Sequence, residues 1–443
     1  MKDLLEKGLI SRRDMLKLSA LGLGSIAFAN PLKSFATTAN SSFKLGKAKS
    51  VIQIWMWGGP SHLDTFDPKP NAGYDYCGPL DKAIGTNVNG IQINSQLPEL
   101  AKLADKYSII RGMSHGINGH ETASYVAQTG RKPGGRIVYP SAGAVVSYLK
   151  GYNNGYKGVL PPYIVMTKPQ GRFSESGFLG NKYKPFSTGG NPVQEVFAVE
   201  GIVAPGISDQ QQIERRKLLN SLDTLGNAMP ENSKFKQFNQ SEQAAYDLMF
   251  GKSKDIFDLR KESDKVREQY GLNTFGQSCL AARRLVEEGV PYVTINYRGW
   301  DTHKQHFETM KTKLPEFDRG FSMLLKDLSD RGLLDSTVIW CSGEFGRGPK
   351  IQWDSPWNGG RSHYGKAYSS ILAGGGFKGG NVVGVTDKYG MEVIQRKVHP
   401  ADLIRSIYIK MGINPNENFN KQGFNEIILP SSKEGSGILK EIM

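Results

Sequence analysis

Six short apolar runs, separated by helical patterns, constrain the fold of this 443-residue chain more than any other feature. The first, at residues 51–57, is almost continuously apolar, as expected for a parallel strand covered on both faces. Strands alternating with helices predict an α/β fold with a doubly wound, mostly parallel sheet. The other strand-like runs lie at residues 107–111, 162–166, 292–296, 337–341 and 368–372, and helical patterns lie at 141–149, 277–288 and 311–330.

The first 29 residues match a twin-arginine (Tat) export signal. Ser11-Arg12-Arg13-Asp14-Met15-Leu16-Lys17 fits the pattern Ser-Arg-Arg-x-Phe-Leu-Lys, with Met15 in place of Phe. The mildly apolar run at residues 18–29 is shorter than the about 20 residues that span a bilayer. It ends in the small-x-small cleavage pattern Ala27-Phe28-Ala29. We therefore expect the Tat translocase to carry this chain, already folded, to the periplasm, the cell envelope or the exterior.

The rest of the chain divides into a linker and one large domain. Residues 30–48 form a Ser/Thr/Ala/Lys-rich linker, and residues 49–443 form the α/β domain. Residues from about 208 to 270 are charged, with helical spacing and no strand pattern, which predicts a helical insertion in that domain. After the signal, no stretch reaches transmembrane length.

The net charge and the spacing of the cysteines limit the kinds of partner and of metal site that we expect. A formal net charge of +14 favours acidic partners such as phosphate or sulfate esters, anionic polysaccharide or a membrane surface. The sequence has no dense Lys/Arg block and no nucleic-acid motif, so we expect no nucleic-acid partner. Its three cysteines form no Cys-x-x-Cys pair, which excludes a thiolate zinc site. A disulfide between Cys77 and Cys279 is an alternative to free thiols.

Histidines collect in the loops next to the predicted strands. In open α/β sheets, ligands bind beyond the carboxyl ends of the strands. Six of the seven histidines fall in such loops: His62, His115, His120, His303, His306 and His363. The seventh, His399, precedes Pro400 and is expected to cap a helix or lie at the surface.

Carboxylates accompany these histidines at Asp64, Asp67, Asp301 and Glu344. Imidazole and carboxylate together are the ligand set for zinc, manganese or iron, whereas all-oxygen sites suit magnesium or calcium. The group predicts a metal centre. Two alternatives are a histidine-rich polar site without metal and carboxylates that cap helices.

Motifs at these same loops resemble a large bacterial family catalogued as domain of unknown function 1501. That family is Tat-exported and is placed with the sulfatases in the alkaline-phosphatase-like superfamily. The resemblance covers nearly the whole mature chain. Besides Ser-Arg-Arg, it rests on Gly58-Gly59-Pro60-Ser61, on Asp64-Thr65-Phe66-Asp67-Pro68-Lys69, on Phe275-Gly276-Gln277-Ser278, on Gly299-Trp300-Asp301-Thr302-His303, on Glu344-Phe345-Gly346-Arg347 and on Leu372-Ala373-Gly374-Gly375-Gly376.

The resemblance implies one or two metal ions at the strand ends. Asp64 matches the early carboxylate ligand loosely. Asp301 with His303, or alternatively His306, matches a later Asp/His pair. Glu344-Phe345 stands where the superfamily has an Asp-His pair, and His363 resembles its final histidine ligand. The implied ligands are Asp64, His120, Asp301, His303, Glu344 and His363, with zinc as the preferred ion and manganese or calcium as alternatives.

The nucleophile departs from the superfamily pattern. Sulfatases carry a Cys or Ser shortly before a Thr-Gly dipeptide, and counting back from Thr129-Gly130 gives His120, with Thr122 just beyond. The chain therefore lacks the residue for formylglycine chemistry. Thr122 is a candidate metal-activated alkoxide, and direct attack by a metal-bound water is the alternative. A Thr in the first turn of a helix is also an ordinary cap.

These features predict an exported metal-dependent hydrolase of phosphate or sulfate esters, with an anionic polysaccharide as one candidate substrate. His120 and Thr122 would stand at the reacting centre. Arg347 and Arg361 lie beside the implied ligands and would hold an anionic group by bidentate hydrogen bonds. The alternative is a non-catalytic, sulfatase-like binding or assembly protein at the cell envelope.

Overall fold

The computed structural model describes residues 43–168, 175–195, 197–199, 253–420, 423 and 425–443, with a few single positions between 208 and 221. Lys44–Met443 form one compact unit. The predicted signal at residues 1–29, most of the linker and most of residues 208–252 lie outside the described residues. Two helices, α10 (Ser253–Phe257) and α11 (Asp264–Tyr270), fall in the last part of the predicted insertion.

An eight-stranded sheet, ordered β12-β4-β11-β8-β1-β7-β5-β6, forms the centre of this unit. Each of the six predicted strands is present in it, so the predicted fold class is confirmed. The strands are β1 (Ser50–Met56), β4 (Tyr107–Met113), β5 (Tyr163–Met166), β6 (Phe186–Ser187), β7 (Tyr292–Tyr297), β8 (Thr337–Ser342), β11 (Tyr368–Gly374) and β12 (Asn381–Val383). Short strands outside it are β2 (Ala83–Gly85), β3 (Gln92–Asn94), β9 (Gly346–Arg347), β10 (His363–Tyr364), β13 (Val385–Thr386) and β14 (Val393–Gln395).

One strand of the sheet runs against the others. β1 is parallel to β7 and β8, β7 is parallel to β5, and β4 is parallel to β12. β11 is antiparallel to both of its neighbours, β4 and β8. The segment that precedes β11 therefore lies at the edge where the other strands end. This reversal brings His363 to the same edge as the loops that follow β4, β7 and β8.

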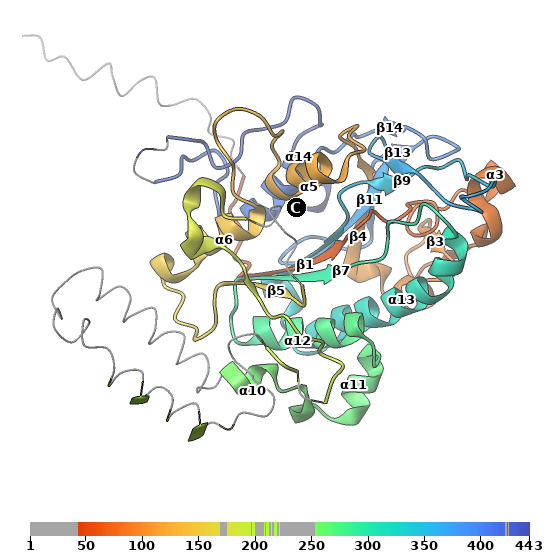
Figure 1. The fold of residues 1–443 in the computed structure, drawn as a ribbon. Helices are drawn as coiled ribbons and strands as arrows, with labels where there is room; N and C mark the ends of the chain where they lie inside the picture. Colours follow the sequence, from red (N-terminus) through yellow and green to blue (C-terminus); the bar gives the residue numbers. More distant parts are fainter. Residues whose placement is uncertain are drawn as a thin grey trace, which may run out of the picture. The chain divides into compact units, whose positions relative to one another are not determined.

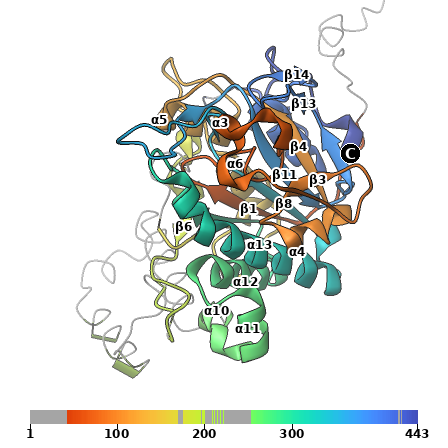
Figure 2. The ribbon, with the colours of Figure 1, turned by 90° about the vertical axis from the view of Figure 1, so that its right-hand side faces the viewer.

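Helices cover both faces of the sheet, as a doubly wound fold requires (Figure 1). α12 (Thr274–Glu287) and α13 (His306–Asp330) lie on one face, and α6 (Ala142–Lys150) and α14 (Pro400–Lys410) lie on the other. Side chains alternate along β1, so that Ile52 and Ile54 pack in the first core and Val51 packs in the second. Figure 2 shows α10 and α11 beyond α12, on the outside of the first layer. The other α-helices among the described residues are α3 (Tyr74–Cys77), α4 (Pro98–Ala101) and α5 (His120–Thr129).

The three cysteines are buried and unpaired. The alternative of a disulfide between Cys77 and Cys279 is therefore wrong. The Cys77 thiol donates to the Lys69 carbonyl at 2.8 Å, and Cys279 packs in the core of the α12 face. Among the described residues, no helix is both long and apolar enough to cross a membrane.

His399 caps α14, which is one of the two roles expected from the sequence; it does not lie at the surface. Its Nδ1 accepts the N–H of Ala401 at 3.2 Å, and the Asp402 carboxylate accepts the N–H of His399 at 3.4 Å. The side chain is buried, and burial lowers the pKa of His399 to about 4. The folded protein therefore holds this imidazole in its neutral form near neutral pH.

We expect the His399→Asn variant to resist mild acid better than the native protein. The pKa of His399 is lower in the folded than in the unfolded chain, where it is near 6.5, so the unfolded chain binds the proton first as the pH falls. Stability is then lost between pH 6.5 and 4, by at most about 3 kcal/mol. Asn still caps the helix but does not titrate in this range. Urea unfolding at pH 7, 6, 5 and 4 measures the difference, and equal losses in both proteins would contradict the prediction.

Candidate metal centre

The end of β1 shapes the site. The strand stops at Gly58 and Gly59, whose φ angles of +106° and +79° lie in the region that side chains rarely adopt. A Cβ atom on Gly58 would lie 2.2 Å from the backbone nitrogen of Asp301. Only glycine at this position lets the loop after β7 approach the end of β1 so closely. Asp301 thereby reaches the middle of the sheet edge.

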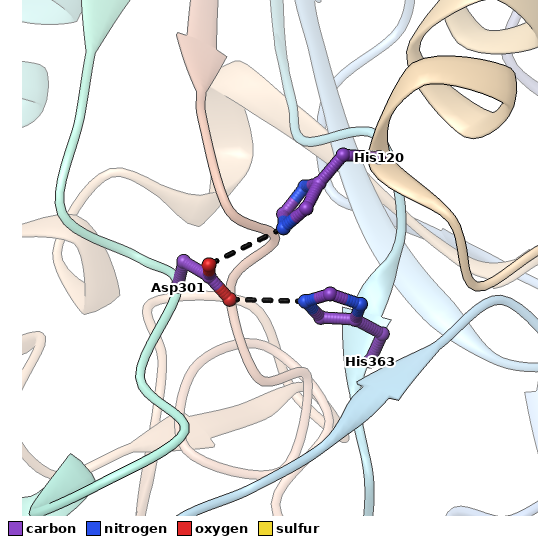
Figure 3. A group of neighbouring side chains, drawn as sticks. All are labelled: His120, Asp301 and His363. Carbon is purple, nitrogen blue, oxygen red and sulfur yellow. Dashed lines mark hydrogen bonds and ion pairs between the residues drawn. The ribbon is translucent and has the colours of Figure 1, made fainter.

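Imidazole nitrogens of His120, the first residue of α5, and of His363, in β10, face the Asp301 carboxylate (Figure 3). Its Oδ2 lies 3.2 Å from Nε2 of His120, and its Oδ1 lies 3.0 Å from Nε2 of His363. Nε2 of His303 lies 3.2 Å from Oδ1 and 2.8 Å from Nε2 of His363. Asp301, His303 and His363 thus converge, as we expected from the sequence. One ligand atom from each of His120, Asp301 and His363 can be chosen so that all three lie within 4.8 Å of one another.

Oxygen acceptors behind two of these histidines fix the ring orientation. Nδ1 of His120 donates to Oε1 of Glu344 at 2.7 Å, and Nδ1 of His363 donates to the carbonyl of Asn118 at 2.8 Å. Both acceptors take a proton on Nδ1, so Nε2 of each ring faces Asp301. Nε2 donates to that carboxylate when the ring is protonated and carries the lone pair for a metal ion when the ring is neutral. Histidines that bind metals show this same pattern of outer partners.

Glu344 and Arg347 lie behind the centre and hold it together. Both side chains are fully buried. The Glu344 carboxylate accepts the N–H of Gly58 at 3.0 Å as well as the bond from His120. Nη1 of Arg347 donates to the carbonyl of Gly58 at 3.0 Å and to Oδ1 of Asp301 at 2.8 Å. The sequence proposed Glu344 as a ligand and Arg347 as a substrate contact, but the structure places both as supports.

The electrostatics of the centre favour positive charge. Burial acts to raise the pKa of Asp301, but hydrogen bonds from His120 and His363 and the charge of Arg347 bring it well below its usual range. Hydrogen bonds to Asp301 and Glu344 raise the pKa of His120 to about 9, against the effect of burial. Burial lowers the pKa of His303. The carboxylates at this point stabilise a cation, whether a proton or a metal ion.

Asp64 belongs to a separate, buried cluster. Its Oδ2 lies 2.9 Å from Nε2 of His306 and 2.8 Å from Nε of Arg361. Burial acts to raise the pKa of Asp64, but Arg361 and His306 lower it to about 2. Nδ1 of His306 lies 2.6 Å from the hydroxyl of Thr302. Asp64 therefore does not lie in the group around Asp301. Its contacts with His306 and Arg361 hold the neighbouring loop in place instead.

Arg361 and Thr122 also differ from their expected roles. Arg361 is fully buried and donates to the carbonyls of Gly348, Pro349 and Tyr76 as well as to Asp64. It therefore cannot reach a substrate. Thr122 is exposed in the first turn of α5, and its side chain forms no hydrogen bond with the described residues. The N-cap residue of this helix is Gly119, so Thr122 does not have the capping role that was its alternative.

The other loop histidines have structural partners. Nε2 of His62 contacts the carbonyl of Gly390 at 2.8 Å, and Nε2 of His115 contacts the carbonyl of Glu344 at 2.7 Å.

Sequence analysis did not identify the backbone carbonyl of Asn118 as the partner of His363, because every residue has a backbone carbonyl. It also missed Trp57, whose ring stacks on His120 at a centroid distance of 5.9 Å. The position of Trp57 at the end of a predicted strand was the available signal.

Comparison with known proteins identifies the family but no activity. No curated protein matches the sequence significantly. Similar solved structures include the lipoteichoic acid synthase LtaP from Listeria monocytogenes (TM-score 0.38, 9% identity, 87% of this chain and 75% of that one), alkaline phosphatase from the Antarctic bacterium TAB5 (0.34, 10%, 76% and 94%) and the PsFucS1 sulfatase from Pseudoalteromonas sp. (0.31, 14%, 77% and 66%). The sequence profile of a family described as "Protein of unknown function (DUF1501)" matches residues 48–433. Because this match spans most of the chain, the protein belongs to the DUF1501 family.

Proposed function

We propose that this protein binds a divalent metal ion at His120, Asp301 and His363, with His303 as a further ligand, and hydrolyses phosphate or sulfate esters there. The observation that carries the proposal is the spacing of the ligand atoms. Ligands about 2.0–2.1 Å from a tetrahedral or octahedral ion lie roughly 2.9–3.4 Å apart. The contacts of Asp301 with each of the three histidines, and of His303 with His363, measure 2.8 to 3.2 Å.

The donor set points to the kind of ion. Imidazoles with one carboxylate suit zinc and, after it, manganese. Calcium takes six to eight oxygen ligands, so this group does not fit it. When bound, such an ion supplies a Lewis acid for the ester oxygens and an activated water.

Exposed side chains give an ester access to the site, and buried partners orient the ligand rings. The side chains of Asp301 and His303 are 39% and 37% exposed, so an ester can approach them from solvent. Glu344 and Asn118 keep the ligand rings of His120 and His363 in place. Since Arg347 and Arg361 are buried, other cations must hold the anionic substrate.

We expect Thr122→Ala to retain most activity and His303→Ala to lose it. The Thr122 hydroxyl has no hydrogen-bonding base among the described residues, whereas His303 contacts both Asp301 and His363. Loss of a residue that hydrogen-bonds to a metal ligand lowers metal affinity about 10–100-fold. Loss of the His303 imidazole, itself a proposed ligand, should lower it by at least as much. Turnover of 4-nitrophenyl phosphate and sulfate, measured together with metal content, tests both variants.

Two results would change this proposal. Loss of turnover with metal retained in Thr122→Ala would make Thr122 the nucleophile. A metal-loaded native protein that hydrolyses no ester would refute the hydrolase and favour a binding or assembly protein at the cell envelope.

Tat export is part of the proposal and has its own test. In Arg12→Lys/Arg13→Lys the charge stays, but the guanidinium groups that the Tat receptor is expected to recognise are gone. We expect most of the precursor to remain in the cytoplasm. Cell fractionation measures this, with Lys2→Arg/Lys7→Arg as the matched control. Normal export of the twin-arginine variant would remove the Tat assignment.

A further inference from the structure

A cavity of about 610 Å³ opens beyond the ends of β5 and β7, at the same sheet edge as the metal centre. Its walls include residues that follow both strands and residues at the start of α12. Cavities of roughly 300–1,000 Å³ hold small organic ligands. The volume is far more than a single sulfate or phosphate ion fills.

The cavity is basic. Lys168, Arg298 and Lys313 line it, against one acid, Glu316. The Glu316 carboxylate lies 3.3 Å from the hydroxyl of Tyr297 and forms no ion pair with Lys313. The charge balance favours an anionic ligand.

Lys313 is the cation that most needs a partner. Its Nζ lies 3.7 Å from the centroid of the Tyr297 ring and 5.6 Å from that of Trp300, and it forms no hydrogen bond or ion pair with the described residues. Burial lowers the pKa of Lys313 to about 8, although the nearby charge of Glu316 acts to raise it. The aromatic faces stabilise the ammonium group only in part, because they accept none of its three hydrogen bonds. An anionic oxygen in the cavity would accept them.

Neutral polar groups complete the walls. Amides and hydroxyls line the same space: Thr167, Asn191, Asn273, Thr274, Ser278 and Asn296. Amides and hydroxyls both donate and accept hydrogen bonds, as the hydroxyl groups of a sugar do. Cations together with such groups suit a ligand that carries both hydroxyl groups and negative charge.

One loop joins this cavity to the metal centre. Arg298 precedes Asp301 by three residues, a span of at most about 11 Å. Between them lies Gly299, with a φ angle of +95°, where a Cβ atom would lie 2.7 Å from Cε of Lys313. The loop that carries Asp301 therefore packs directly on Lys313. A ligand longer than one sugar unit can reach both places.

We propose that this cavity binds a second anionic group of an acidic oligosaccharide while the ester to be cleaved lies at Asp301. The inference rests on the proposed function and narrows its substrate class to sugars that carry at least two sulfate or phosphate groups. Small aryl esters would occupy the metal centre alone.

Calorimetric binding of a disaccharide with two sulfate groups tests the cavity. The same disaccharide with one or no sulfate, and its bis-phosphorylated counterpart, show which group is recognised. Native protein treated with a chelator should bind the bis-sulfated or the bis-phosphorylated probe at least about tenfold more tightly than the probe with no anionic group. Lys313→Met and Arg298→Ala should each weaken that binding about tenfold.

Lys311→Met is the matched control. Lys311 lies on the same helix, is 67% exposed and pairs with Glu308 outside the cavity. It should leave binding unchanged. Equal affinity of the native, Lys313→Met and Lys311→Met proteins for the bis-anionic probes would overturn the cavity proposal, as would binding that disappears with the metal.

The outcome is separable from that of the proposed function. If no ester is hydrolysed but Lys313→Met still weakens binding by the chelated protein, the hydrolase fails and the cavity stands. If aryl esters are hydrolysed but the cavity variants bind the bis-anionic probes normally, the cavity fails and the hydrolase stands. With both intact, Lys313→Met should raise KM for the bis-sulfated or bis-phosphorylated sugar, and Lys311→Met should leave that KM unchanged.

Discussion

Asp301→Asn is expected to lose metal binding and ester hydrolysis together. Asp301 is the one carboxylate of the three-residue group, and its two oxygens contact His120 and His363. An amide keeps the shape but removes the negative charge that favours a cation. Because loss of an outer partner alone costs about 10–100-fold in metal affinity, loss of this ligand should exceed about 100-fold. Metal content after dialysis and kcat/KM for 4-nitrophenyl esters measure the two effects.

Glu344→Gln is the control for this variant. The Gln oxygen still accepts a hydrogen bond from His120, so metal affinity should fall by about 10–100-fold and not vanish. Circular dichroism of the metal-free proteins checks that both variants fold. If Asp301→Asn keeps its metal, the centre is not where we place it.

Arg361→Met is expected to destabilise the fold by about 3–5 kcal/mol, the cost of breaking a buried ion pair from one side. Arg361 has no exposed surface and contacts Asp64 through Nε and Nη2. Without it, the buried Asp64 carboxylate keeps only the contacts of His306 and Ser61 and loses its positive partner. The carbonyls of Gly348 and Tyr76 also lose their donor. Urea unfolding near neutral pH measures the change in the free energy of unfolding.

The double variant Asp64→Asn/Arg361→Met separates the charge effect from lost packing. Removing both charges should recover part of the loss, because the unpaired buried carboxylate is gone. The exposed pair of Lys102 and Glu99, 2.7 Å apart, supplies a comparison, and Lys102→Met should cost at most about 1 kcal/mol. If Arg361→Met costs no more than Lys102→Met, the cluster is not a structural support.

The strands were predictable because their signals are local. A buried central strand such as β1 is a mostly apolar run, which here stops at Gly58 and Gly59, and each of the six predicted runs became a strand of the sheet. The direction of β11 was not predictable, because apolar content says nothing about which way a strand runs. That direction depends on how β11 fits between β4 and β8.

The sequence predicted which loops form the site, but not which of their side chains lie together. Loop position was enough to bring Asp301, His303 and His363 together. It could not separate them from Asp64 and His306, which have the same side-chain chemistry but lie buried beside Arg361. Whether a carboxylate and a histidine form a metal site or a structural ion pair depends on their burial and on which third residue contacts them. A single sequence shows neither.

Because of the reversed strand, the proposed metal centre can form only when the sheet is complete. Asp301 follows His120 by 181 positions and precedes His363 by 62, and β11 fills the place between β4 and β8. Pairings so distant along the chain form late, because a long loop must close first. A nascent chain that ends before His363 lacks one of the proposed ligands. For a protein expected to leave the cytoplasm already folded, a loaded centre would mark the molecules that are ready for transport.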